Sequence, residues 1–177
     1  MFMAGESRVA VHPGWIVAAT SLWIGFACNV KLWRELSGGA GPRGLFDSVA
    51  LGAFIAADCA IVLSVLGWHK TLKATATLLL VLGALSASAI WVQSLPVDAT
   101  LAERKLSTLV LPPWTSLLQW QVPVLLAALA VLPTVWVWNT RVRRLPGPQQ
   151  LNINVIGTLV SCAVLAMSGF LLSRGFA

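Results

Sequence analysis

Residues 45–68 read LFDSVALGAFIAADCAIVLSVLGW, a long apolar stretch that contains two acids, Asp47 and Asp58. A helix needs about 20 apolar residues to cross the hydrocarbon core of a bilayer. The stretch meets that length, and it ends at Trp68, whose indole ring favours the membrane interface. It therefore predicts a transmembrane helix.

Comparable apolar runs recur before and after this one. They cover residues 14–33, 75–95, 117–138 and 151–172. The sequence thus predicts an all-α fold, a polytopic membrane protein built as a bundle of five transmembrane helices. This membrane domain would cover residues 14–177 and follow a short cytoplasmic N-terminal segment, residues 1–13.

The composition excludes an ordinary soluble domain. Hydrophobic residues make up 58% of the chain and charged residues only 10%, against about 25% in soluble domains. The net charge of +6 comes from short basic clusters between apolar runs, which indicate topology signals and contacts with anionic lipids, and no nucleic acid partner. Cys28, Cys59 and Cys162 each lie inside an apolar run and are interpreted as small buried hydrophobes.

Lysines and arginines divide evenly between the two sides of a five-helix topology. The tightest cluster, Arg141–Arg144, favours its own side as the cytoplasm. This places the N-terminus in the cytoplasm and the C-terminus on the opposite side. The longest loop, residues 96–116, then lies outside the cytoplasm, and residues 98–108 are expected to form a short surface helix there.

Asp58 lies near the middle of its apolar run, where a charge costs about 2.5 to 3.5 kcal/mol. We expect it to face the bundle, at the same depth as Ser86, Ser88 and Ser161. One interpretation is a proton relay or a polar substrate contact. The other is a neutral acid that hydrogen-bonds between helices.

Two features predict how the helices pack. Pro123 and Pro133 interrupt the run 117–138 and would free backbone carbonyls there. Small residues four positions apart let helix backbones approach closely. Such pairs are Ser21/Gly25, Gly52/Ala56, Gly83/Ala87 and Gly157/Ser161.

Catalytic signatures are missing from the chain. It contains no GxSxG, HExxH, Walker or GxGxxG motif, and its histidines, His12 and His69, lie at helix ends. Taken by its residues alone, the chain is interpreted as a non-catalytic membrane domain.

Three segments of the chain stand out, residues 29–36, 97–108 and 132–144. They resemble the N-terminal membrane domain of the lipid A phosphoethanolamine transferases, a family of Gram-negative inner-membrane enzymes. Asn29 and Trp33 match the end of the family's first helix, although Lys31 and Leu32 depart from it. The closest match is the run from Leu132-Pro133 through Trp138 to Arg141-Val142-Arg143-Arg144. In the long loop, Asp98 and Thr108 fit, whereas Glu103 and Arg104 stand where the family usually has Gln and Asn.

The resemblance implies a periplasmic catalytic domain after the fifth helix, with a threonine nucleophile and a zinc site. The chain ends at Ala177, about where the family's linker begins, so it is expected to be truncated or split from that domain. Catalytic residues, metal ligands and cofactors are therefore assigned to no residue of this chain, and zinc is expected only in the catalytic domain. Whether the chain takes part in an enzyme is left open.

The resemblance also implies a function in the bacterial inner membrane. The domain would anchor the transferase and present its lipid substrates, phosphatidylethanolamine and lipid A, to the catalytic domain. Residues expected to bind lipid headgroups are Asn29, Trp33, Arg34, Trp91, Gln93, Asp98 and Arg104. The arginines would hold phosphates and the tryptophans would pack around the headgroup.

A stand-alone small membrane protein is the alternative. It would serve as a transporter subunit or as an interaction partner of another membrane protein. Asp58 and the two prolines of the fourth run support this interpretation.

Overall fold

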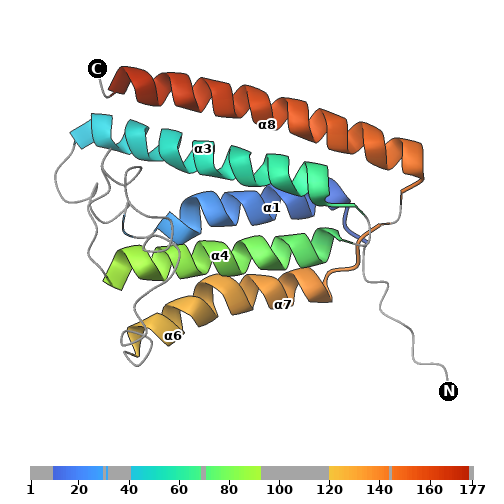
Figure 1. The fold of residues 1–177 in the computed structure, drawn as a ribbon, viewed down its shortest axis with the longest axis horizontal. Helices are drawn as coiled ribbons and strands as arrows, with labels where there is room; N and C mark the ends of the chain where they lie inside the picture. Colours follow the sequence, from blue (N-terminus) through green and yellow to red (C-terminus); the bar gives the residue numbers. More distant parts are fainter. Residues whose placement is uncertain are drawn as a thin grey trace.

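The computed structural model describes residues 10–29, 31, 41–68, 71–92, 120–143 and 145–175, which form a helical bundle (Figure 1). Its helices are α1 (Pro13–Phe26), α3 (Gly41–Leu66), α4 (Leu72–Val92), α6 (Gln121–Leu126), α7 (Leu132–Asn139) and α8 (Gly147–Gly175). A 3₁₀ turn, η1 (Ala27–Asn29), follows α1, and a π-helical turn, η4 (Ala127–Val131), joins α6 to α7. The predicted all-α fold is confirmed for the described residues.

Four helical stretches of the described chain are long and apolar enough to cross a membrane. They are α3, α4, the continuous stretch from α6 to α7, and α8. The remaining helix, α1, has 14 residues, or about 21 Å of length, which falls short of a hydrocarbon core of about 30 Å. The span predicted for residues 14–33 is described up to Asn29 and at Lys31, which is helical, and the rest of it lies outside the described residues.

The helices lie side by side in the order α8, α3, α1, α4 and α6–α7 (Figure 1). Helices α1, α4 and α8 run in one direction, and α3 and α6–α7 run in the other. At the end where α1 begins, the Val11 amide donates to the Arg141 carbonyl at 2.8 Å and the Arg143 amide donates to the Val11 carbonyl at 2.9 Å. These bonds tie the start of the chain to the segment after α7.

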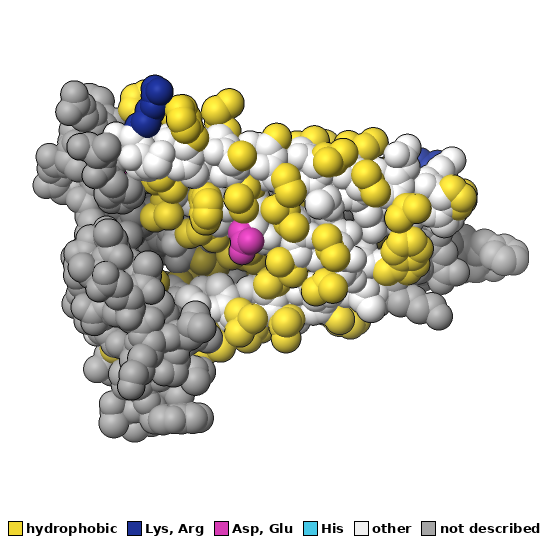
Figure 2. All heavy atoms as spheres, turned by 45° about the horizontal axis from the view of Figure 1, so that its top comes forward, with side chains coloured by type: hydrophobic (Ala, Val, Ile, Leu, Met, Phe, Trp, Pro, Cys, Tyr) yellow, Lys and Arg dark blue, Asp and Glu magenta, His cyan; other side chains and the backbone are white. Residues whose placement is uncertain are grey.

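The bundle interior is small. Its larger cluster of buried side chains comes from α1, α3, α4 and α7 and consists of Ile16, Ile24, Leu63, Leu72, Ala76, Leu80 and Val137. Helix α8 contributes none of these, and its outer face carries exposed apolar side chains such as Leu159 and Phe170. Figure 2 shows hydrophobic side chains along the length of the helices and basic side chains toward the ends, as expected where lipid surrounds the protein.

Close packing of α1 on α3 depends on small residues, as the sequence predicts. A Cβ atom built on Gly25 would meet the Gly52 carbonyl oxygen and would lie 2.7 Å from the Ala56 Cβ. Two pairs of small residues, one on each helix, therefore meet at this crossing.

Candidate functional site

The expected headgroup residues fall mostly outside the described part of the chain. Trp33, Arg34, Gln93, Asp98 and Arg104 belong to that group, as does the surface helix expected at residues 98–108.

Two expected headgroup residues are described. Asn29 ends η1, and its side-chain amide donates to the Gly25 carbonyl. Trp91 is half-buried in the last turn of α4. Because α1 and α4 run in the same direction, both residues lie at the same end of the bundle.

The polar residues expected at mid-membrane depth do not converge. The Ser86 hydroxyl donates to the Leu82 carbonyl at 2.9 Å, and the Ser88 hydroxyl donates to the Leu85 carbonyl at 2.8 Å. Both serines therefore bond to their own helix, α4. Ser161 is buried on α8, which packs against α3.

Asp58 corrects a sequence expectation. It was expected to face the bundle, but its side chain is exposed on α3. Helix α3 packs on α1 through Gly52 and Ala56 and faces Gly157 of α8 through Ser64. The two faces of α3 that pack against other helices carry small residues, which permit close contact. The Asp58 carboxyl group lies on a third face of α3, away from both.

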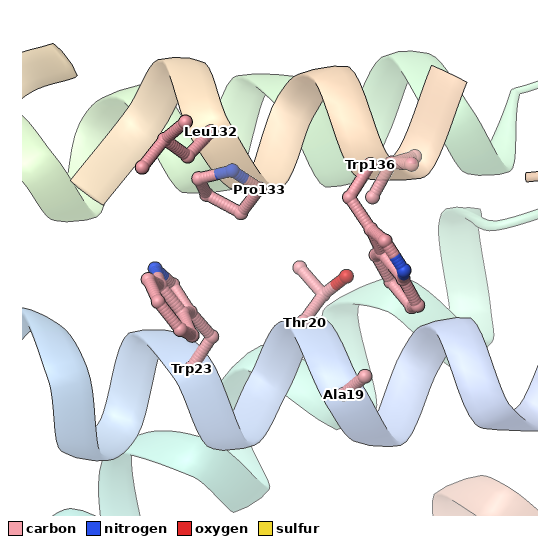
Figure 3. Close-up of a pocket in the computed structure, with 7 residues that line it drawn as sticks. Ala19, Thr20, Trp23, Leu132, Pro133 and Trp136 are labelled. Carbon is pink, nitrogen blue, oxygen red and sulfur yellow. The ribbon is translucent and has the colours of Figure 1, made fainter. Parts of the chain in front are cut away.

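A groove lies between α1 and α7 (Figure 3). Its cavity volume is about 340 Å³, and it is lined by Ala19, Thr20, Trp23, Leu132, Pro133, Trp136 and Val137. Figure 3 shows Trp23 and Trp136 at opposite ends of the groove with Thr20 between them. All these residues are uncharged, so the groove suits a hydrocarbon chain.

Pro133 explains why the groove wall is shaped as it is. Proline has no amide hydrogen, so the carbonyl four residues earlier, that of Leu129, loses its helical donor. The Trp23 indole nitrogen of α1 donates to that carbonyl at 3.1 Å. The same stretch widens into η4, where the Leu132 amide reaches back to the Ala127 carbonyl. The prediction that prolines free carbonyls in this helix is confirmed at Leu129.

Thr20 lines the groove between the two tryptophans. The residue is 3% exposed, and its hydroxyl is buried without a hydrogen-bond partner. A hydroxyl in a helix usually donates to a carbonyl of its own helix. Because the Thr20 hydroxyl is sealed from water-sized molecules, it offers no contact to a molecule in the groove, whose accessible surface is apolar.

The opposite end of α7 is fixed by a lysine. The Lys73 ammonium of α4 donates to the carbonyls of Trp138 at 3.0 Å and Thr140 at 2.8 Å. It also lies 5.8 Å from the centre of the Trp138 ring. A cation at a helix C-terminus satisfies free carbonyls and the helix dipole. This contact holds the C-terminal end of α7 against α4.

Metal chemistry finds no support among the described residues. They contain no group of three or more His, Cys, Asp or Glu side chains that could hold a metal ion.

The groove itself was missed by the sequence analysis. In the sequence, Trp23 lies in the middle of the apolar run 14–33, and Pro133 interrupts the run 117–138. Nothing local connects two residues so far apart in the chain. The one signal for their contact is that each lies near the middle of its own apolar run, which places both at a comparable depth in the membrane.

Comparison with known proteins gives one match. A family model described as phosphoethanolamine transferase EptA/EptB matches residues 55–177, more than half of the chain. Matching residues thus include α4, α6, α7 and α8 and the later part of α3. No curated protein and no solved structure matches the chain.

Proposed function

The chain belongs to the EptA/EptB phosphoethanolamine transferase family through its N-terminal membrane domain, and we propose that it anchors the transferase and presents lipid to it. The described helices make it a multi-pass membrane protein, as expected for an inner-membrane enzyme of this family. Phosphatidylethanolamine is the proposed donor lipid and lipid A the proposed acceptor. Transfer itself would occur in a periplasmic catalytic domain.

The position of the α1–α7 groove carries this proposal. Trp23 at the groove precedes Asn29 by six residues on a nearly continuous helical path, about 9 Å along the axis. A lipid whose headgroup lies near Asn29 and Trp91 therefore has its acyl chain within reach of the groove. The indole rings of Trp23 and Trp136 at the two ends of the groove would limit the position of the acyl chain in it.

Binding energy would come mainly from the headgroup. An acyl chain gains little by leaving the bilayer for an apolar groove, because both surroundings are apolar. Charge-assisted hydrogen bonds to the lipid phosphate supply the larger share. Arg34 and Arg104 are the proposed donors, with Trp33, Gln93 and Asp98 around them.

The orientation of the domain is part of the proposal. With the N-terminus in the cytoplasm, the end that holds Asn29 and Trp91 faces the periplasm. Lys73, Arg141 and Arg143 lie toward the other end, where the positive-inside rule favours them. The presented lipid would then belong to the outer leaflet of the inner membrane.

Photo-cross-linking tests the lipid site. The protein is placed in lipid nanodiscs with phosphatidylethanolamine that carries a diazirine in one acyl chain, and cross-linked peptides are mapped. We expect cross-links in the peptides that contain Thr20 and Pro133, with a several-fold loss in Thr20→Trp, which fills the groove. Leu159→Trp on the outer face of α8 is the matched control and should change nothing.

Two outcomes would contradict the proposal. Equal cross-linking of α8 and of the groove peptides would mean that the lipid is only bulk bilayer. Unchanged lipid binding after the double substitution Arg34→Ala and Arg104→Ala would remove the headgroup assignment.

A second candidate function rests on Asp58. Its exposed carboxyl group in a spanning helix costs about 2.5 to 3.5 kcal/mol when it faces lipid. A donor on a partner helix would lower that cost. This favours a subunit of a transporter, or an interaction partner of another membrane protein.

Solute flux into proteoliposomes separates the two functions. Flux that is present in the wild-type protein and lost in Asp58→Asn would support the second candidate. The first candidate predicts no flux from either protein and the same groove cross-linking from both.

A further inference from the structure

A second cavity lies on the other side of α1, where α1, α3 and α8 meet. Its volume is about 240 Å³. Polar side chains line it in an otherwise apolar setting: Ser64 of α3, and Gln150, Asn154 and Ser161 of α8. It extends along α8 from Gln150 to Ser161, or about 16 Å at the rise of an α-helix.

Two hydroxyls in this cavity lack protein partners. Ser64 and Ser161 are 4% and 8% exposed, and neither donates to its own helix. Other serines in the same two helices do, since Ser48 bonds to the Gly44 carbonyl at 2.6 Å and Ser168 to the Val164 carbonyl at 2.8 Å. Leaving a buried hydroxyl without a partner lowers the stability of the folded protein.

The unpartnered oxygens of Ser64 and Ser161 open onto the cavity. The hydroxyl oxygens of Thr20, Ser21 and Thr134 have no hydrogen-bond partner and are inaccessible to water-sized molecules. Those of Ser64 and Ser161 are not enclosed in this way. Both serines therefore offer hydrogen bonds to whatever occupies the space.

Amides add to this polar surface. The Gln150 side chain is 4% exposed and donates to the Asn154 side-chain oxygen at 3.0 Å. That bond leaves further donor and acceptor positions on both amides. Because donors and acceptors are present and charged side chains are absent from the lining, the site selects a small, uncharged molecule.

We infer that this cavity holds water inside the membrane domain and that the side chains of Ser64, Gln150, Asn154 and Ser161 form hydrogen bonds with that water. The site is polar and has room for several waters, the two conditions that buried water requires. Polar side chains within a membrane span commonly line such water-filled cavities. Water would enter from the end of the bundle where α1 begins, since Pro13, Gly67 and Gln150 line the cavity there.

A neighbouring cavity lies along the same seam between α3 and α8, on the side where apolar side chains such as Val65 and Leu159 are exposed. It has a volume of about 280 Å³ and shares Ser64 and Asn154 with the first. These two residues therefore separate the polar cavity from the lipid-facing one.

Thiol accessibility tests this inference independently of the lipid proposal. In the full chain with its three native cysteines replaced by alanine, Ser64→Cys and Ser161→Cys are made separately and placed in lipid nanodiscs. Each is treated with methyl methanethiosulfonate, a small uncharged reagent that reacts with the thiolate. Leu159→Cys on the lipid face and Ser168→Cys outside the cavity are the matched controls.

We expect both cavity cysteines to react at least about tenfold faster than either control, because desolvation that shifts a thiol by one pKa unit cuts the thiolate fraction tenfold. Adding Asn154→Leu should slow both reactions toward the control rate by filling and drying the cavity. Reaction of both cavity cysteines at the control rate in nanodiscs would overturn the inference. Fast reaction in detergent but not in nanodiscs would also overturn it, since lipid and not water would then fill the space.

Discussion

At the scale of single residues, Trp23 in the middle of the first apolar run has a structural role of its own. Its indole nitrogen supplies the hydrogen bond that Pro133 removes from the Leu129 carbonyl. Trp136, at the other end of the same groove, has similar exposure but makes no indole hydrogen bond in the described structure. The two tryptophans therefore form a natural comparison.

Trp23→Phe should lower the free energy of unfolding by about 1 kcal/mol more than Trp136→Phe, since only the first substitution orphans a carbonyl in the membrane. Reversible unfolding in mixed micelles measures both variants. Equal losses would show that packing alone accounts for the effect of Trp23.

At the scale of elements, helix contacts depend on how closely two backbones approach. Gly25 lies at the α1–α3 crossing, where an added Cβ would stand 2.7 Å from the Ala56 Cβ. Gly169 of α8 faces Phe54 of α3 at a looser point, where an added Cβ would stand 3.6 Å from the ring. The same substitution should thus act in opposite directions at the two glycines.

Gly25→Ala should destabilise the protein by about 1 to 3 kcal/mol, because α1 and α3 must move apart. Gly169→Ala should leave stability unchanged or raise it by up to about 1 kcal/mol, because alanine restricts the unfolded chain and meets only ordinary contact. Thermal unfolding of the two variants in one detergent compares them. A loss of stability in Gly169→Ala as large as in Gly25→Ala would contradict this account.

At the scale of the whole molecule, α8 is joined to the bundle differently from the other helices. It packs against α3 but contributes no side chain to the main buried clusters. Its inward face carries polar and small residues, including Gln150, Gly157 and Ser161. The contact between α8 and α3 is the most extensive helix contact in the described part of the chain, so the polar and small residues of this face attach α8 to the bundle.

Gly157→Leu should detach α8, because even the Cβ of a side chain at 157 would lie 3.0 Å from the Ser64 hydroxyl. A protease site placed in the connector between Arg143 and Gly147 allows a test. After cleavage, α8 should stay with the bundle in the wild-type protein and in Ala163→Leu, a control on its exposed face. Retention in Gly157→Leu should be lower by about tenfold or more, equivalent to about 1.4 kcal/mol. Full retention would mean that α8 is held by contacts outside this seam.

The sequence by itself determined the class and the helices of this protein. Apolar runs of bilayer length require helices, because a backbone in lipid must satisfy its own hydrogen bonds. The close approach at Gly25 and the freed carbonyl near Pro133 were also predictable, since glycine and proline act locally. The resemblance at Leu132–Arg144 pointed to the family that the comparison then gave.

Tertiary structure alone decided which face of each helix packs inward. Helices that are apolar all round carry no periodic contrast to indicate their inner face. For that reason the exposure of Asp58 could not be predicted from local pattern. Neither could the hydrogen bond from Trp23 to Leu129 or the cavity that Ser64 and Ser161 both line. These positions were set by the fit between small residues on neighbouring helices, which depends on the whole bundle.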